Sequence, residues 1–216
     1  MSKVILYSFS RSSASYRVRI ALRLKGIEFE YRSINMLKEP GEQYTEEFRK
    51  LNPKCELPVL LIDDLVLTQS LPIMEYLEET RGEMGQHLLP KDPAKRAIVR
   101  KLAEIVNSGI QPIQNLSVMR HLPAEVDRDA WAGHWIRRGF EAFEAELAKV
   151  SGKYCVGDEL SMADICLVPQ VFNANRFHVD MAPFPIITRI SKMLNEMDAF
   201  KKSHPDVQPD AAVGIS

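Results

Sequence analysis

Two adjacent serines stand where the chain changes from a strand pattern to a helix pattern. Ser12 and Ser13 follow the apolar segment Lys3–Ser8 and precede a run with helical spacing. The first N–H groups of a helix have no partner inside it, and a serine hydroxyl lies beside them. Together such groups can bind an anion. In a simpler interpretation, which the residues leave open, one serine only caps the helix.

A second candidate is Leu57-Pro58, at the start of a predicted strand. A cis bond before this proline would turn the backbone of Leu57 outward, where its N–H and C=O could pair with an extended peptide ligand. A proline is also tolerated at a strand start for purely structural reasons, because no ladder donor is lost there. Both interpretations remain open at this point.

A third candidate is Gln69-Ser70, at the start of another helix. Ser70 is the predicted N-cap, and its hydroxyl with the neighbouring N–H groups could bind a ligand carboxylate or simply cap the helix. All three candidates lie at the ends of elements of one predicted sheet, where the ligands of such sheets gather. The three together predict one anionic, peptide-sized site.

The elements that would hold these residues alternate along the N-terminal part of the chain. Their order is β-α-β-α-β-β-α, which is typical of βαβ units around a mixed sheet. Asp63-Asp64 is expected to form a two-residue turn between the last two strands. The expected strands are Lys3–Ser8, Glu28–Arg32, Leu57–Ile62 and Leu65–Thr68, and the expected helices are 12–26, Glu42–Leu51 and a third one from Leu71.

Beyond a segment rich in glycine, proline and charge, the pattern is helical only. Ser161 and Asp164 resemble a capping box at the start of one of these helices. We expect a mixed α/β domain over residues 1–82, a linker over 83–93 and an all-α domain over 94–216. The expected helices are Ala94–Asn107, Ala130–Lys149, Ile165–Ala174 and Pro185–Leu194.

Composition argues against several classes of protein. The chain has 216 residues, of which 45% are hydrophobic and 26% charged, so an ordinary globular protein is expected. A formal net charge of −1 gives no field for nucleic acid or an anionic membrane, and the apolar runs are shorter than the ~20 residues of a membrane span. Met1 leads almost directly into the first strand, so no signal peptide is expected.

The cysteines and histidines carry no metal-binding or disulfide pattern. Cys55, Cys155 and Cys166 form no C-x-x-C pair, so neither a zinc site nor a disulfide framework is expected, and a reducing compartment fits best. The five histidines show no H-E-x-x-H motif, and we expect no metal site.

Cations occur in two notable places. Arg17, Arg19, Arg23 and Lys25 are predicted to form a solvated face of the first helix. Arg176 follows a mostly apolar helix, where it could pair with the last carbonyls of that helix or bind a substrate anion, and the sequence leaves both roles open.

The first helix also carries a family signature. Residues 12–22, SSASYRVRIAL, closely resemble the S-S-C-x-x-R-V-R-I-A-L signature of zeta-class glutathione transferases, the maleylacetoacetate (maleylpyruvate) isomerases. The resemblance runs from about Ile5 to Asp210, nearly the whole chain. Further matches are Gln69-Ser70-Leu71, Glu75–Thr80, Gly109–Pro112, Gln114–Val118, Tyr154–Asp158 and Met162–Asp164.

This resemblance implies a fold and a site. It implies a thioredoxin-like N-terminal domain that binds glutathione, an all-α domain that supplies much of the substrate pocket, a homodimer, and a cytoplasmic protein. Ser12 would hold the glutathione sulfur as thiolate, with Ser13 beside it as the second catalytic residue. The implied glutathione site comprises Ser12, Ser13, Ala14, Ser15, Arg17, Gln43, Leu57, Pro58, Gln69, Ser70, Gln111, Asn115, Leu116 and Ser117, and Arg176 and Arg11 would bind a substrate carboxylate.

The resemblance also implies an activity. Glutathione would add as thiolate to a cis double bond of a maleylacetoacetate-type substrate, allow rotation, and leave, as in the catabolism of tyrosine and other aromatic compounds. Two alternatives are transfer or dehalogenation of small α-halo acids and a non-catalytic binding module. The chain departs from the signature at Ala14, where the family has cysteine. We expect isomerisation to survive this change, because glutathione itself can be the nucleophile.

Overall fold

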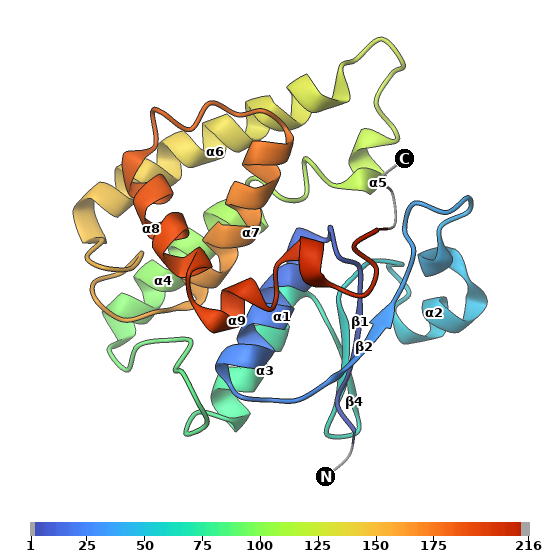
Figure 1. Cartoon of the computed structure of the whole chain (residues 1–216), viewed down its shortest axis with the longest axis horizontal. Helices are drawn as coiled ribbons and strands as arrows, with labels where there is room; N and C mark the ends of the chain where they lie inside the picture. Colours follow the sequence, from blue (N-terminus) through green and yellow to red (C-terminus); the bar gives the residue numbers. More distant parts are fainter. Residues whose placement is uncertain (1–2, 213–216) are drawn as a thin grey trace. The chain divides into compact units, whose positions relative to one another are not determined.

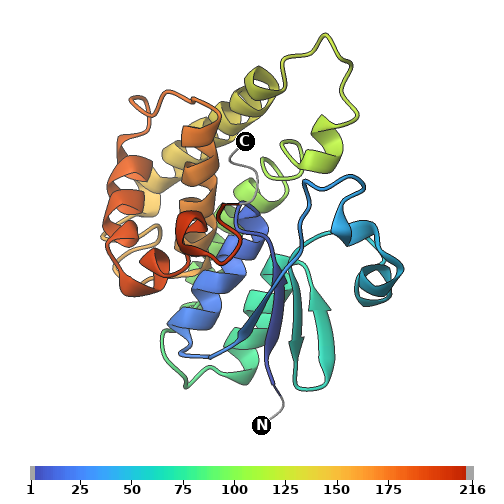
Figure 2. The same cartoon turned by 45° about the vertical axis from the view of Figure 1, so that its right-hand side comes forward.

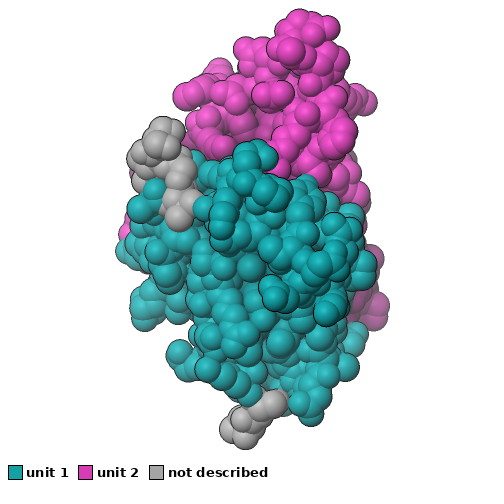
Figure 3. Space-filling model, turned by 90° about the vertical axis from the view of Figure 1, so that its right-hand side faces the viewer, with its two compact units in different colours: residues 1–86, 198–216 teal, residues 87–197 magenta. Residues whose placement is uncertain are grey.

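The computed structural model describes residues 3–212, which form two compact units. Unit 1 takes the described residues up to Gln86 together with those from Asp198 onward, and unit 2 is His87–Met197 (Figure 3). The division between Gln86 and His87 falls inside the segment expected to be a linker. In the described part of the chain, no helix is both long and apolar enough to cross a membrane.

Unit 1 is built on one four-stranded sheet. Its strands are β1 (Ile5–Ser8), β2 (Glu30–Ser33), β3 (Val59–Ile62) and β4 (Leu65–Thr68), in the spatial order β2-β1-β3-β4. β1 is parallel to β2, whereas the pairs β1 with β3 and β3 with β4 are antiparallel. Helices α1 (Ser13–Leu24) and α3 (Ser70–Thr80) cover one face, and α2 (Glu46–Leu51) lies on the other (Figures 1 and 2). The expected mixed α/β domain is confirmed.

The turn between β3 and β4 fixes the register of this hairpin. Asp63 and Asp64 have positive φ angles of 51° and 62°, as a two-residue hairpin turn requires. Aspartate tolerates this backbone region better than most residues do. The resulting pairing sets Val59 opposite Thr68. The turn predicted from Asp63-Asp64 is therefore confirmed.

Helix α1 begins and ends where its sequence predicts. Ser12 is its N-cap, and Gly26 just beyond the C-cap has a φ of 66°. Gly26 donates its N–H to the carbonyl of Arg23, and Ile27 donates to that of Leu22, at 3.1 and 2.9 Å. These two bonds form a Schellman motif, which satisfies carbonyls that the helix end leaves without partners. The Ser12 hydroxyl is thereby held at a fixed helix start.

One expected helix of unit 1 is divided in two. The sequence predicts a single helix over Glu42–Leu51, but the structure has a 3-10 turn, Glu42–Tyr44, followed by α2. Thr45 causes the break, because it adopts an extended backbone and accepts the N–H of Phe48 through Oγ1 at 3.3 Å. A threonine with this geometry is an N-cap, so a new helix begins after it.

The C-terminal segment packs with unit 1. From the sequence, residues 94–216 are expected to form one domain, whereas the described residues from Asp198 onward group with the N-terminal sheet. This segment contains α9 (Asp198–Lys201) and the 3-10 turn Pro205–Val207. Its physical anchors are the buried Phe200 and two hydrogen bonds: Ser203 accepts one from Arg19 of α1, and Asp210 accepts one from Ser10 in the loop after β1.

Unit 2 contains helices only, as expected. Its helices are α4 (Pro93–Asn107), α5 (Leu116–Met119), α6 (Arg128–Val150), α7 (Met162–Arg176) and α8 (Pro185–Asn195). α7 begins with the predicted capping box, in which Asp164 accepts both the N–H and the hydroxyl of Ser161. α7 is almost wholly buried, which explains why its sequence is apolar on every side. The short helix α5 was not predicted.

The predicted solvated face of α1 is wrong. Arg17 and Arg19 are both 0% exposed and Lys25 is 1% exposed. Each cation has a partner distant in sequence: Lys25 pairs with the carboxylate of Glu78 at 2.7 Å, Arg17 donates a hydrogen bond to Ser70, and Arg19 donates one to the carbonyl of Ser203. Burial of a charge is tolerated when such partners replace water.

Candidate functional site

Sheet register brings the three sequence candidates to one edge. Tyr7, near the end of β1, pairs with Val59 at the start of β3, and Val59 pairs with Thr68 at the end of β4. The loop after β1, the residues before β3 and the residues after β4 therefore lie along the same edge of the sheet. Ser12, Leu57 and Gln69-Ser70 are carried by these segments.

The Ser12 side chain is held so that its hydroxyl hydrogen remains available. Ser12 Oγ accepts the N–H of Ser15 at 3.2 Å. The first intrahelical bond runs from Tyr16 N to Ser12 O at 2.9 Å, so the N–H groups of Ser13 and Ala14 precede the helical ladder. One hydroxyl and two N–H groups therefore meet at the start of α1, a set of donors suited to an anion.

Leu57 and Pro58 take the conformation that the functional interpretation required. The peptide bond between them is cis. Leu57 is 8% exposed and belongs to a buried cluster with Phe9, Phe48 and Val59. Because Phe9 begins the loop that leads to Ser12, this apolar cluster holds the Leu57 segment and the Ser12 loop side by side.

The start of α3 differs in one respect from its prediction. The N-cap is Gln69, not Ser70, and Gln69 has a φ of 68°. Ser70 is the first helical residue, and its Oγ accepts a hydrogen bond from Arg17 Nη1 at 3.1 Å. Because Ser70 is held by a cation from α1 instead of capping its own helix, the starts of α1 and α3 are joined.

Three further residues of the expected glutathione site have buried side chains. Arg17 and Ser15 are 0% exposed, and Gln43 is 1% exposed. Ser15 Oγ and Gln43 Oε1 are buried with no hydrogen-bond partner among the described residues. Of these three side chains, Arg17 contacts the site through its hydrogen bond to Ser70. Gln69 is exposed, and Ser12, Ala14 and Arg11 are partly exposed.

The remaining expected site residues belong to unit 2. Asn115 is the N-cap of α5, and its Oδ1 accepts the N–H of Ser117 at 3.0 Å and the Ser117 hydroxyl at 3.1 Å. Leu116 begins α5, and Gln111 is partly exposed. Arg176 is the exposed last residue of α7, with its guanidinium carbon 5.1 Å from the centre of the Phe177 ring.

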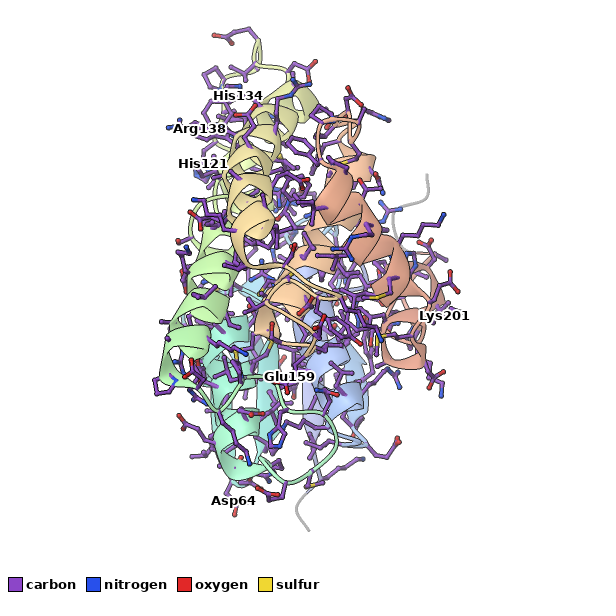
Figure 4. The ribbon with its side chains drawn as sticks, turned by 90° about the vertical axis from the view of Figure 1, so that its left-hand side faces the viewer. Asp64, His121, His134, Arg138, Glu159 and Lys201 are labelled. Atoms are coloured by element: carbon purple, nitrogen blue, oxygen red, sulfur yellow. The ribbon has the colours of Figure 1, made fainter. Side chains whose placement is uncertain are left out.

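The histidines of unit 2 are not gathered into a metal-binding group. His134 and Arg138 project outward from α6, and His121 accompanies them on the same flank of unit 2 (Figure 4). His121 lies 2.7 Å from the carbonyl of Ser117 through Nδ1. Within residues 3–212, no three histidine, cysteine or acidic side chains are close enough to hold a metal ion.

Sequence reasoning missed two residues that organise the Ser12 loop. Arg19 donates to the carbonyl of Ser10, and Asp210 accepts the N–H of Ser10, at 3.0 Å in both cases. Arg19 was predicted to be solvated, and nothing in the sequence around Asp210 indicated a tertiary partner. The one signal was the matched Gln208-Pro209-Asp210 tail within the family resemblance.

Comparison with known proteins identifies the family. The model of the glutathione S-transferase N-terminal domain matches residues 11–80, and that of the C-terminal domain matches residues 126–199. The chain is 55% identical over 208 residues to the maleylacetoacetate isomerase of Mus musculus, covering 96% of this chain and 95% of that protein. The chain belongs to the glutathione S-transferase family.

Solved structures agree with this assignment. A bacterial zeta-class glutathione S-transferase, a maleyl pyruvate isomerase, matches with a TM-score of 0.90 and 42% identity over 95% of this chain and 99% of that one. The maleylacetoacetate isomerase of Anaeromyxobacter dehalogenans 2CP-1, with glutathione bound in its active site, matches with a TM-score of 0.87 and 41% identity over 97% and 98%. The resemblance to the zeta-class glutathione transferases is confirmed.

Proposed function

We propose that this glutathione transferase is a glutathione-dependent cis-trans isomerase of maleylacetoacetate-type substrates. The observation that carries the proposal is the start of α1. There the Ser12 hydroxyl can donate its hydrogen to a ligand, because Ser12 Oγ is the acceptor in its bond with Ser15 N. Relatives named maleylacetoacetate isomerase that match over nearly the whole chain support the same reaction.

The donors at the start of α1 fit an anionic sulfur. A thiol with a pKa of about 8.5 is mostly protonated at neutral pH, and a hydroxyl donor at a helix N-terminus favours its thiolate. Ser12 would donate to the sulfur, and the N–H groups at Ser13 and Ala14 add positive potential. Glutathione, when bound, supplies the thiolate that adds to the double bond of the substrate and leaves after rotation.

The other segments at this edge would hold the rest of the tripeptide. The backbone N–H and C=O of Leu57, before cis Pro58, suit pairing with an extended peptide. Gln69 and the N–H groups at the start of α3 suit a carboxylate, and Ser70 is kept there by Arg17. Gln43, whose Oε1 is a buried acceptor with no donor among the described residues, would border this set, as the family resemblance implies.

Unit 2 would supply the substrate contacts. We assign the substrate carboxylate to Arg176, the exposed cation at the end of α7, and Arg11 of unit 1 is the second candidate cation. Gln111 and Asn115-Leu116-Ser117 would border the glutathione site, as the family resemblance implies. A guanidinium suits this task because it binds a carboxylate through two parallel hydrogen bonds.

We propose the metabolic role, oligomeric state and location of the enzyme from the family resemblance. A maleylacetoacetate-type substrate places the enzyme in the catabolism of tyrosine and other aromatic compounds, and the family resemblance implies a homodimer. A cytoplasmic location fits the three cysteines, which are buried and form no disulfide within the described residues, because thiols persist in reducing compartments.

Glutathione transfer to small α-halo acids is the second candidate. A relative 42% identical to this chain, from Arabidopsis thaliana, is named glutathione S-transferase Z1. Displacement of a halide would use the same Ser12 and the same Arg176. A panel of maleylacetoacetate, maleylpyruvate and an α-chloro acid, each with glutathione, separates the two reactions. The isomerase proposal expects loss of the cis substrates to exceed chloride release, and dominant chloride release would replace it with the transferase.

A further inference from the structure

The loop between β1 and α1 is held by two charged side chains from outside it. The loop runs from Phe9 to the N-cap Ser12, and backbone groups of Phe9 and Ser10 are bonded to Arg19 and Asp210. Asp210 lies 200 residues away from Ser10 in the chain. All of these residues belong to unit 1.

Arg19 binds the loop from the α1 side. Its Nη1 donates to the carbonyl of Phe9 at 3.2 Å and to Ser8 Oγ at 3.1 Å, and its Nη2 donates to the carbonyl of Ser10 at 3.0 Å. Its Nε donates to the carbonyl of Ser203 in the C-terminal segment at 3.0 Å. The side chain is fully buried, and burial lowers its pKa to about 10.

Asp210 binds the loop from the C-terminal segment. Its Oδ2 accepts the N–H of Ser10 and the hydroxyl of Ser33, both at 3.0 Å, and its Oδ1 accepts the hydroxyl of Tyr31 at 2.7 Å. Its backbone carbonyl also accepts the Ser10 hydroxyl at 3.2 Å. Asp210 is 5% exposed, and its negative charge favours the buried cation of Arg19.

These bonds restrict the position of the Ser12 hydroxyl. Phe9 O, Ser10 N and Ser10 O are all occupied by Arg19 or Asp210, and Ser12 N donates to the same Phe9 carbonyl at 3.0 Å. A shift of the loop would therefore move Ser12. Because a misplacement of about 1 Å can cost on the order of 100-fold in rate, this restriction matters for any chemistry at Ser12.

We propose that Arg19 and Asp210 are positioning residues for Ser12, and that the C-terminal segment thereby helps to set how strongly the site ionises the thiol of bound glutathione. The proposal rests on the proposed role of Ser12 in binding the sulfur. In this proposal neither Arg19 nor Asp210 contacts glutathione or substrate. Their effect on Ser12 therefore passes through the loop between β1 and α1.

The experiment compares Asp210→Ala with Asp206→Ala in the full-length enzyme. Asp206 is an acidic residue of the same segment with 78% of its side chain exposed, and its side chain lies beside His204 and not at the loop. The pKa of bound glutathione is measured from its ultraviolet thiolate absorbance as a function of pH. We expect Asp210→Ala to raise this pKa by roughly one unit and to lower kcat about tenfold, and Asp206→Ala to change neither.

A milder variant provides a second test if Asp210→Ala does not fold. Tyr31→Phe removes one hydrogen bond to Asp210, which keeps its bonds to Ser10 and Ser33. It should shift the thiol pKa in the same direction by a smaller amount, with an unchanged circular dichroism spectrum. A folded Asp210→Ala or Tyr31→Phe enzyme with the wild-type thiol pKa and kcat would overturn the positioning role.

The measurements distinguish failure of the positioning role from failure of the isomerase proposal. If the wild-type enzyme lowers the thiol pKa and Asp210→Ala raises it, but no cis-trans isomerisation occurs, the positioning role stands and the isomerase proposal fails. If the wild-type enzyme isomerises and Asp210→Ala leaves the thiol pKa unchanged, only the positioning role fails. Failure of the wild-type enzyme to bind glutathione would overturn both.

Discussion

Arg17 Nη1 donates a hydrogen bond to Ser70 Oγ at 3.1 Å, between two residues that are both buried in unit 1. The bond joins the start of α3 to α1, whose N-cap is Ser12. The two helix starts that carry the candidate glutathione donors are therefore linked through side chains as well as through the sheet.

Replacing Arg17 should weaken glutathione binding. Arg17→Met leaves Ser70 without its charged donor, and such a hydrogen bond contributes about 1.5–3 kcal/mol. We expect the dissociation constant for glutathione to rise by about tenfold in isothermal titration calorimetry. Arg137→Met, at an exposed position of α6, is the matched control and should bind as the wild type does. Equal affinities in all three enzymes would show that Ser70 needs no support from Arg17.

Replacing Ser12 should lower turnover. Ser12→Ala removes the hydroxyl of the α1 N-cap, and loss of one such donor to an anion typically costs on the order of 10²–10³ in kcat. The same change removes an N-cap, which should cost about 1 kcal/mol of stability. Ser12→Thr keeps a hydroxyl and should retain much of the activity, and Ser108→Ala, at an exposed serine of unit 2, should retain all of it. A wild-type kcat in Ser12→Ala would show that Ser12 acts only as a helix cap.

Restoring the family cysteine tests the departure at position 14. Ala14 is the second residue of α1 and is partly exposed, so a cysteine fits without entering the core. We expect Ala14→Cys to keep the melting temperature and to raise kcat/KM, because a thiol would add a polar group beside the anion. Unchanged kinetics would show that the position is catalytically silent in this enzyme.

The capping box of α7 leads to a prediction about pH. Burial raises the pKa of Asp164, although the N–H groups of Cys155 and Ser161, both donated to its carboxylate, act in the opposite direction. Between the ordinary aspartate pKa of about 3.9 and this raised value, the folded chain holds a proton that the unfolded chain has lost. The stability contributed by that proton is full below the lower limit and is lost as the pH rises through the folded pKa.

Asp164→Asn isolates this contribution. The variant should be less stable than the wild type at neutral pH by about 1–3 kcal/mol, because an amide cannot accept all three hydrogen bonds. The variant has no titrating carboxyl at position 164. The stability difference in favour of the wild type should therefore grow as the pH is lowered into the acidic range. Urea unfolding at neutral and acidic pH measures this difference. A difference that shrinks on acidification would contradict a raised pKa for Asp164 in the folded chain.

Local signals in the sequence predicted most of the elements. Helix α1 carries both of its end signals, Ser12 and Gly26, and the turn at Asp63-Asp64 uses residues that tolerate positive φ. The capping box at Ser161 marks α7 in the same way. In each case the deciding interactions join residues a few positions apart, so they can be recognised in the sequence.

Long-range interactions account for the errors at the α1 cations and at the C-terminal segment. Arg17, Arg19 and Lys25 have a charged helix pattern, but their partners Ser70, Ser203 and Glu78 come from distant segments. The return of the C-terminal segment to unit 1 depends on Asp210 meeting Ser10 in the same way. No local sequence pattern indicates such distant partners. The position of the candidate site residues at helix and strand ends was therefore predictable, whereas the residues that hold these ends in place were not.

The most direct test of the isomerase proposal is the rate of loss of the cis double bond of maleylacetoacetate, followed by absorbance with increasing glutathione and with none. We expect turnover that is absent without glutathione and saturates with it, and all of the glutathione should be recovered at the end. Absence of glutathione-dependent turnover at any enzyme concentration would contradict the proposal, as would stoichiometric consumption of glutathione.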